Sequence, residues 1–319
     1  MTEFRRVPVG EVELNVAIQG EGPLVVMVHG FPESWYSWRH QMGPIAAAGF
    51  TACAIDVRGY GGSDKPHPIE AYDLESLSGD VAGLIEALSP DQPGVVIGHD
   101  WGAPVAWTTA LVHPERVRAV AGLSVPYTGV PTRSLSDIID AVYKSKGRFF
   151  YQDYFAAEGV AEAELEADVR GAVRRLYYAW GGEAPTEAWR SDKRLGDRVL
   201  TGLPDPDPFP AWLSDADIDF MVSELERSGF RGGLNRYRNH DRDFTFLRQF
   251  QGRRIEQPAL FIAGDRDSVL SMFGDRLSLM TDELPDLRGA HMLPGCGHWT
   301  QQERPEEVNN LLLPWLTSL

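Results

Sequence analysis

The sequence predicts an α/β protein in which a helical segment is inserted into a core with a mostly parallel central sheet. Short continuous apolar runs indicate strands buried on both faces, as in a parallel sheet, and they lie at residues 24–28, 51–55, 94–97 and 119–123. Helix-length segments separate them, at residues 34–47, 73–88 and 101–112. This alternation of strands and helices is typical of a doubly wound α/β core. Before it, apolar and polar residues alternate over 12–18, which indicates a half-exposed strand.

The pattern changes after the last of these runs. Residues 127–240 show no convincing buried strand, but amphipathic stretches at 162–176 and 214–227 are typical of helices. Four prolines in the segment 202–210 prevent regular structure there. The sequence therefore predicts a helical insert.

The α/β pattern returns near the C-terminus, with strand signals at 259–263 and 288–292 and a helix at 305–316. A core built from both ends of the chain explains this order. We expect an α/β core formed by residues 1–126 and 243–319, and a helical cap formed by residues 127–242.

The composition is that of a globular protein, since 43% of the residues are hydrophobic and 24% are charged. The chain has 30 Lys and Arg against 46 Asp and Glu, which gives a formal net charge of −16. A surface this acidic repels phosphate backbones and anionic lipids. We therefore expect no nucleic-acid partner and no membrane partner.

The N-terminal residues lack the apolar stretch of a signal peptide, and no run approaches the roughly 20 apolar residues of a spanning helix. Cys53 and Cys296 are far apart in sequence and adjoin strand-like or glycine-rich segments, so we expect buried, reduced thiols rather than metal ligands. These observations predict a soluble, cytoplasmic protein.

The strongest local motif is G-H-D-W-G at residues 98–102, which directly follows an apolar run and precedes a helix-like segment. Two glycines flanking a central residue in this context are the nucleophile-elbow pattern, in which a tight turn exposes the central side chain above the sheet. The usual serine is replaced here by Asp100. The alternative is a glycine-flanked turn with an aspartate that caps a helix.

A carboxylate nucleophile changes the chemistry that the elbow can perform. Attack on an electrophilic sp³ carbon forms an alkyl ester of the aspartate, which water then cleaves at the aspartate carbonyl. The motif therefore predicts that epoxides or alkyl halides, rather than esters, are the substrates.

Cleavage of such an ester requires a base and an acid that orients it, in the chain order nucleophile, acid, histidine. His298 in G-C-G-H-W is the candidate base. Asp267 and Asp265, in G-D-R-D after the run 259–263, are the two candidate acids. The oxyanion formed on Asp100 needs donors, which we assign to the backbone N–H groups of Phe31 and Trp101.

Taken together, these elements resemble the α/β-hydrolase fold and, within it, the soluble epoxide hydrolases, over residues 10–316. The resemblance is carried by HGFPESWYSWRHQ at 29–41, DVRGYGGSDKP at 56–66, GHDWGAPVAW at 98–107, YQDYFAAEGVAEAELEADVR at 151–170, SGFRGGLNRYRN at 228–239, GDRD at 264–267 and CGHWTQQERPEEVN at 296–309.

The resemblance implies an epoxide hydrolase that uses an epoxide and water, without metal or organic cofactor, and forms a vicinal diol through a hydroxyalkyl ester. It favours Asp267 as the acid. It assigns Tyr151 and Tyr237 as the two phenols that bind the epoxide oxygen, one of which donates its proton. It also implies that the cap closes a mostly apolar pocket, which Phe31, Trp35 and Trp101 would line.

Two other functions are compatible with parts of this pattern. A haloalkane or haloacid dehalogenase would use the same Asp–His–Asp residues, but it would need halide donors in place of the paired phenols. A ligand sensor on a hydrolase scaffold would have little reason to keep the nucleophile, acid, base and both phenols. The pair Tyr151 and Tyr237 is therefore the feature that favours the epoxide hydrolase.

Overall fold

A computed structural model of the chain describes residues 1–185, 188 and 192–319. Its central feature is an eight-stranded sheet in the order β1-β2-β4-β3-β5-β6-β7-β8. β1 and β2 are antiparallel, as are β2 and β4, and every later pair is parallel. The strands are β1 (Glu3–Val9), β2 (Val12–Gln19), β3 (Leu24–Val28), β4 (Thr51–Ile55), β5 (Gly94–His99), β6 (Val117–Leu123), β7 (Ala259–Gly264) and β8 (Leu287–Leu293).

Helices cover both faces of this sheet. Those of the α/β core are α1 (Arg39–Ala47), α2 (Leu74–Leu88), α3 (Gly102–Val112), α11 (Met280–Glu283), α12 (Thr300–Glu303) and α13 (Pro305–Thr317). One apolar cluster packs α2 and α3 against one face, and a second packs α1 and α13 against the other. The fold is thus the expected α/β class with a mostly parallel sheet.

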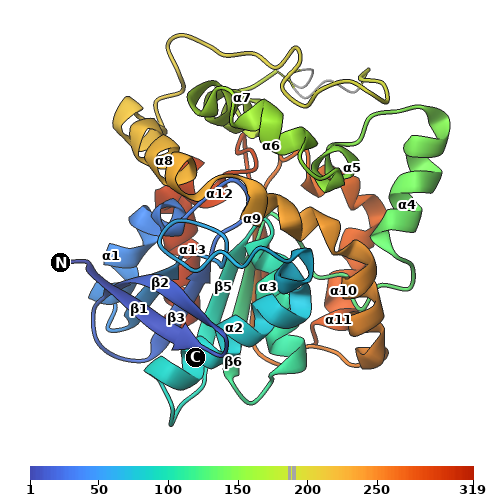
Figure 1. Cartoon of the computed structure of the whole chain (residues 1–319). Helices are drawn as coiled ribbons and strands as arrows, with labels where there is room; N and C mark the ends of the chain where they lie inside the picture. Colours follow the sequence, from blue (N-terminus) through green and yellow to red (C-terminus); the bar gives the residue numbers. More distant parts are fainter. Residues whose placement is uncertain (186–187, 189–191) are drawn as a thin grey trace.

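The chain between β6 and β7 forms helices in its described part. They are α4 (Leu135–Val142), α5 (Tyr151–Ala156), α6 (Val160–Leu165), α7 (Val169–Trp180), α8 (Asp215–Ser228), α9 (Arg231–Asn235) and α10 (His240–Leu247). Figure 1 shows α5, α6, α7 and α8 above the sheet and α10 beside it. A third apolar cluster joins α5, α6, α7, α8 and α9 to Phe31 and Trp299 of the core. The expected boundary between residues 242 and 243 lies inside α10, so the division into domains stays a prediction.

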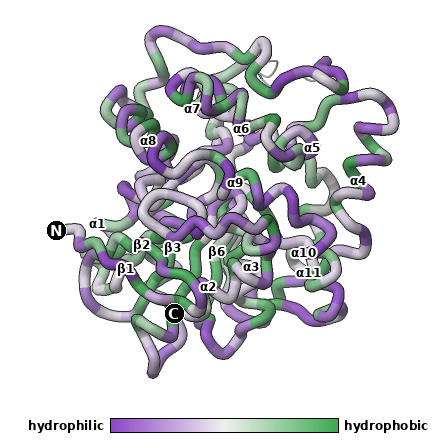
Figure 2. The backbone as a smooth tube through the Cα atoms, viewed as in Figure 1, coloured by the Kyte–Doolittle hydropathy of each residue, from purple (hydrophilic) through white to green (hydrophobic). Residues whose placement is uncertain are grey.

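Burial explains why the strand patterns were readable in the sequence. All residues of β3, β5 and β7 are buried, which is why these strands are continuous apolar runs. Figure 2 shows hydrophobic residues gathered along the central strands, whereas hydrophobic and hydrophilic residues alternate along α7 and α8. Cys53 and Cys296 are both buried free thiols, as expected from the sequence.

Three local expectations need correction. β1, which is mostly exposed, was not predicted. The helix expected over 162–176 is two helices, because Asp168 accepts a hydrogen bond from the Gly171 N–H and thereby starts α7. The helix expected over 34–47 begins with a 3₁₀ turn, Trp35–Trp38, before α1.

Candidate active site

Asp100 occupies the sharp turn between β5 and α3. Its φ of 49° is in the left-handed region, which is unfavourable for a residue with a side chain. The flanking glycines permit the turn: a Cβ on Gly98 would lie 2.0 Å from the Gly102 carbonyl oxygen, and a Cβ on Gly102 would lie 2.1 Å from the Val28 carbonyl oxygen. The local geometry is therefore that of a nucleophile elbow, with an aspartate at its tip.

His298 lies between two carboxylates. Its Nε2 is 3.3 Å from Asp100 Oδ2, and its Nδ1 is 3.0 Å from Asp267 Oδ2. Asp267 follows β7 and His298 follows β8, so both come from the carboxyl ends of neighbouring parallel strands. The other candidate acid, Asp265, instead accepts a hydrogen bond from the Gly295 N–H. The structure thus brings Asp100, His298 and Asp267 together and leaves Asp265 out.

The two carboxylates control the charge of the imidazole. Burial disfavours the charged form of His298, but Asp267 and Asp100 outweigh it and raise the pKa of this histidine well above its usual value. The imidazolium is therefore favoured as long as both carboxylates are ionised. Loss of either negative charge removes part of this effect.

The turn after β3 supplies a backbone donor to the same carboxylate. The Phe31 N–H donates to Asp100 Oδ1 at 2.8 Å. The Trp101 N–H makes no hydrogen bond to the Asp100 carboxylate, as far as the structure describes the chain. The Phe31 amide thus contacts the Asp100 carboxylate, and the oxyanion roles of the Phe31 and Trp101 amides both stay predictions.

The two tyrosines lie side by side near Asp100. Tyr151 is the first residue of α5, and Tyr237 is in the short 3₁₀ helix Arg236–Arg238, with 6.3 Å between the ring centroids. Burial and the charge of Asp100 raise the pKa of both phenols above the usual value. Both hydroxyls therefore stay protonated at neutral pH and can donate hydrogen bonds.

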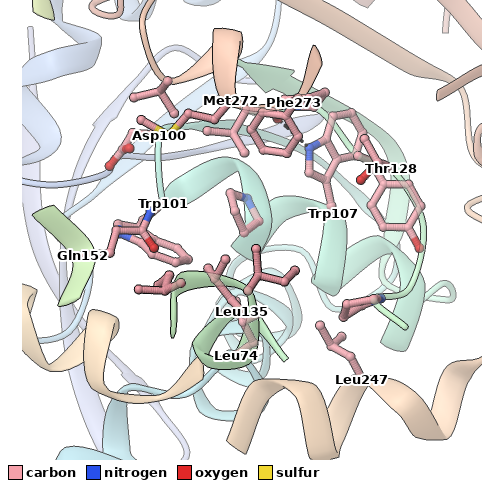
Figure 3. A pocket seen from close by; sticks show the side chains of 18 of the residues that line it. Leu74, Asp100, Trp101, Trp107, Thr128, Leu135, Gln152, Leu247, Met272 and Phe273 are labelled. Atoms are coloured by element: carbon pink, nitrogen blue, oxygen red, sulfur yellow. Dashed lines mark hydrogen bonds between the residues drawn. The ribbon is translucent and has the colours of Figure 1, made fainter. Parts of the chain in front are cut away.

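A cavity of about 430 Å³ extends from Asp100. Figure 3 shows Asp100, Trp101 and Gln152 at one end and Thr128 and Leu247 at the other. Of the expected lining residues, Trp101 contacts the cavity, whereas the Phe31 ring packs against other aromatic residues beside it. Trp35 is not part of the lining: its ring packs against Phe4 and Phe220. The pocket expectation for Trp35 is therefore not met at this cavity, because its ring is occupied by packing against other aromatic side chains.

Sequence reasoning missed a buried pair behind the histidine. His99 Nδ1 is 2.7 Å from Glu33 Oε1, and His99 Nε2 is 2.8 Å from the His298 carbonyl oxygen. The Ser124 hydroxyl donates to the same carbonyl at 2.7 Å. These contacts hold the backbone of His298 in place. Glu33 and His99 lie within the quoted motifs, but 66 residues separate them, so the sequence alone gives no sign of their contact.

Arg236 is buried beside the site. Its guanidinium is 4.7 Å from the centroid of the Trp101 ring and forms an ion pair with Asp243. Burial lowers the pKa of Arg236 to about 10, so it remains charged at neutral pH. The ion pair with Asp243 therefore holds the charged guanidinium of Arg236 against the ring of Trp101, the residue that follows Asp100.

The described residues contain no group of three His, Cys, Asp or Glu side chains that could hold a metal ion. Nor does any helix in the described part of the chain have the length and apolar character needed to cross a membrane.

The elbow and the order of its partners along the chain place the protein in the α/β-hydrolase class. A model of the alpha/beta hydrolase fold family matches residues 23–172. Epoxide hydrolase B of Mycobacterium tuberculosis is 41% identical over 330 residues, which cover 94% of this chain and 92% of that protein.

Solved structures give the same result. An epoxide hydrolase from an endophytic Streptomyces superimposes with a TM-score of 0.95 at 44% identity, over 99% of this chain and 96% of that one. Epoxide hydrolase A from Mycobacterium thermoresistibile superimposes with a TM-score of 0.94 at 40% identity, over 100% of this chain and 99% of that one. The chain belongs to the epoxide hydrolase family of the α/β-hydrolase fold.

Proposed function

We propose that the protein converts an epoxide and water to a vicinal diol through a covalent ester on Asp100. One observation carries this proposal: an elbow aspartate in contact with His298 lies at the end of a cavity that also contains the phenol of Tyr151. The epoxide hydrolases to which the chain is similar support the same reaction.

In the first step, a carboxylate oxygen of Asp100 attacks one epoxide carbon, and the bond from that carbon to the epoxide oxygen breaks. Tyr151 and Tyr237 donate hydrogen bonds to this oxygen, and one of them transfers its proton, so that a hydroxyl group forms. The product is a hydroxyalkyl ester, and one phenol is left as a phenolate. Both phenols belong to residues 127–242, the expected cap, which would hold them over Asp100.

The second step uses the change in charge that the first produces. The ester has no negative charge, so one of the two carboxylates that stabilise the imidazolium is lost, and His298 releases its proton, which returns to the phenolate. Neutral His298, oriented by Asp267, then removes a proton from water, which attacks the Asp100 carbonyl. The Phe31 and Trp101 amides stabilise the oxyanion, the C–O bond of the ester breaks, and His298 gives the proton to the leaving oxygen, so that the diol departs. The Asp100 carboxyl then protonates His298, which restores the starting charges.

Trapping of the ester tests this route. His298→Gln should still form the ester but fail to hydrolyse it, because the base is absent. Incubation of this variant with styrene oxide should therefore increase the intact protein mass by the mass of one epoxide. Asp100→Ala is the matched control and should gain no mass. An unlabelled His298→Gln protein that still folds and binds the epoxide would contradict the covalent route.

The dehalogenase alternative is tested with the wild-type protein. A matched alkyl halide, incubated with the wild-type protein, should release no halide while styrene oxide yields its diol. Halide release without diol formation would instead assign the protein to the dehalogenases.

A further inference from the structure

The cavity that extends from Asp100 is lined almost entirely by uncharged residues. Among the described residues that line it, the only ionisable carboxylate is Asp100, and none is Lys, Arg or His. Its wall is mainly aliphatic and aromatic, with residues such as Leu111, Ile138 and Phe273. The Tyr127 hydroxyl on this wall is buried without a hydrogen-bond partner and can donate to a neutral acceptor. An ionised group in this cavity would therefore be desolvated without a counterion.

The cavity lies on one side of the Asp100 carboxylate, and packed aromatic side chains lie on another. The cavity extends from one side of the carboxylate toward Leu247 (Figure 3). Away from the cavity, Asp100 contacts Phe31, whose ring packs against Phe155, Phe230 and Tyr237. Each of these four side chains is at most 3% exposed. A long substituent therefore has room on only one side of the epoxide ring.

A groove beside the cavity shares Ile139 and Gln152 with its wall. Two cations, Lys144 and Arg238, lie in this groove, and each pairs with a carboxylate, Asp153 and Glu162 respectively. The carboxylates that line the groove are more numerous: Asp137, Asp140, Asp153, Glu158 and Asp241. Two further titratable groups, Tyr237 and His240, line the groove, and both are neutral, because burial raises the pKa of the tyrosine well above its usual value and lowers that of the histidine to about 3. The negative potential of the groove opposes the approach of an anion.

We infer that the substrate is an uncharged epoxide with one elongated apolar arm, held with the arm in the cavity and the ring at Asp100. This inference rests on the proposed function. Epoxides that carry a carboxylate on the arm are poor substrates, because the cavity has no cation to pair with it. Epoxides with long substituents on both ring carbons are poor substrates, because the aromatic residues around Phe31 leave no room for the second arm.

A matched pair of substrates tests the charge requirement. An ω-epoxy fatty acid and its methyl ester have the same arm and differ only in the charge at its end. We expect kcat/KM for the ester to exceed that for the acid by about 100-fold, because the acid is buried without a counterion. The internal trans-epoxide of the same number of carbons should also react more slowly than the terminal epoxide. Equal turnover of acid and ester, or faster turnover of the internal isomer, would overturn the inference.

A variant with a cation at the far end of the cavity makes the test specific. Leu247→Arg should increase kcat/KM for the acid relative to the ester by at least 10-fold. Gln249→Arg, an exposed position nearby that does not line the cavity, makes the same change in net charge and should leave the ratio unchanged. Leu247→Met, which keeps the cavity uncharged, should also leave it unchanged. An equal gain in Gln249→Arg would mean that net charge alone sets the preference and would overturn the inference.

The two proposals fail in different ways. If no epoxide in the panel forms a diol, the proposed function is wrong. If diols form without preference for the neutral, one-armed epoxides, the proposed function stands and only the substrate inference is wrong.

Discussion

At the scale of single residues, the identity of residue 100 determines the chemistry. A serine at this elbow would form an ester with an acyl group of the substrate, whereas Asp100 itself becomes the acyl part of the ester. Its negative charge also has a second effect, because it raises the pKa of His298 together with Asp267. In the proposed mechanism, Asp100 therefore serves both as the nucleophile and as a control on the protonation of the base.

This second role can be measured directly. Asp100→Asn removes one of the two negative charges next to His298, so we expect the pKa of His298 to fall. Titration of the imidazole by NMR, in the wild type and in the variant, provides the comparison. Asp265→Asn, a carboxylate that bonds to the Gly295 N–H instead of to His298, is the control and should change this pKa much less. An unchanged pKa in Asp100→Asn would contradict the proposed link between the two steps.

In the proposed mechanism, the phenols of Tyr151 and Tyr237 donate to the substrate only in the first step. Tyr151→Phe and Tyr237→Phe should each reduce the rate of ester formation by roughly 10²-fold, and the double variant by more, since general acid catalysis contributes about 10²–10⁴-fold. Single-turnover measurements of ester formation and ester hydrolysis separate the two steps. Tyr178→Phe, whose ring packs against Phe209 in the cap, should have little effect. A selective loss of ester hydrolysis in the phenol variants would argue against the proposed role.

At the scale of elements, the close packing of β3, β5 and α3 positions the nucleophile. Gly102→Ala would place a methyl group 2.1 Å from a backbone oxygen of β3. Because a backbone atom cannot move aside easily, we expect a loss of about 3 kcal/mol in the free energy of unfolding. Urea unfolding measures this loss, together with a fall in activity. The control is Gly79→Ala in α2, where a Cβ meets nothing within 4 Å, and this change should stabilise the protein by about 0.5–1 kcal/mol.

At the scale of the whole molecule, Glu33 connects parts of the chain that are distant in sequence. It accepts hydrogen bonds from the Gly30 N–H and from Gln301, and it pairs with His99 at the end of β5. Burial opposes its ionisation, but the His99 charge and hydrogen bond outweigh this and lower the pKa of Glu33 to about 2. The ionised carboxylate therefore stabilises the folded state above the usual pKa of glutamate, and this stabilisation is lost as the pH falls through about 2.

Glu33→Gln tests this contribution. At neutral pH the variant should lose on the order of 3 kcal/mol of unfolding free energy relative to the wild type. At pH 3 the difference should shrink by roughly half, because the glutamate of the unfolded chain is then mostly protonated while the folded carboxylate is still ionised. Glu70→Gln, an exposed glutamate, is the control and should show no such pH dependence. A difference that stays constant with pH would show that charge is not the cause.

Local patterns account for what could be predicted from the sequence. Buried parallel strands require continuous apolar runs, and the elbow requires small residues next to Asp100, so both are visible within a few adjacent residues. His298 follows β8, and the fold's chain order points to it as the base. The same order leaves both Asp265 and Asp267 after β7 as candidate acids, and only the resemblance favoured Asp267. The assignment of Tyr151 and Tyr237 depended on resemblance, because nothing local distinguishes a catalytic tyrosine from a packed one.

The sequence by itself determined the class of the fold, and it also singled out the proposed nucleophile and the histidine proposed to activate water. Tertiary structure alone decided that Trp35 packs against Phe4 and Phe220, that Glu33 pairs with His99, and that the cavity extends to one side of Asp100. The physical reason is that backbone geometry depends on neighbouring residues, and these leave a pattern in the sequence. Contacts between side chains depend on which distant segments the packed core brings together, and this information is not contained in any single segment.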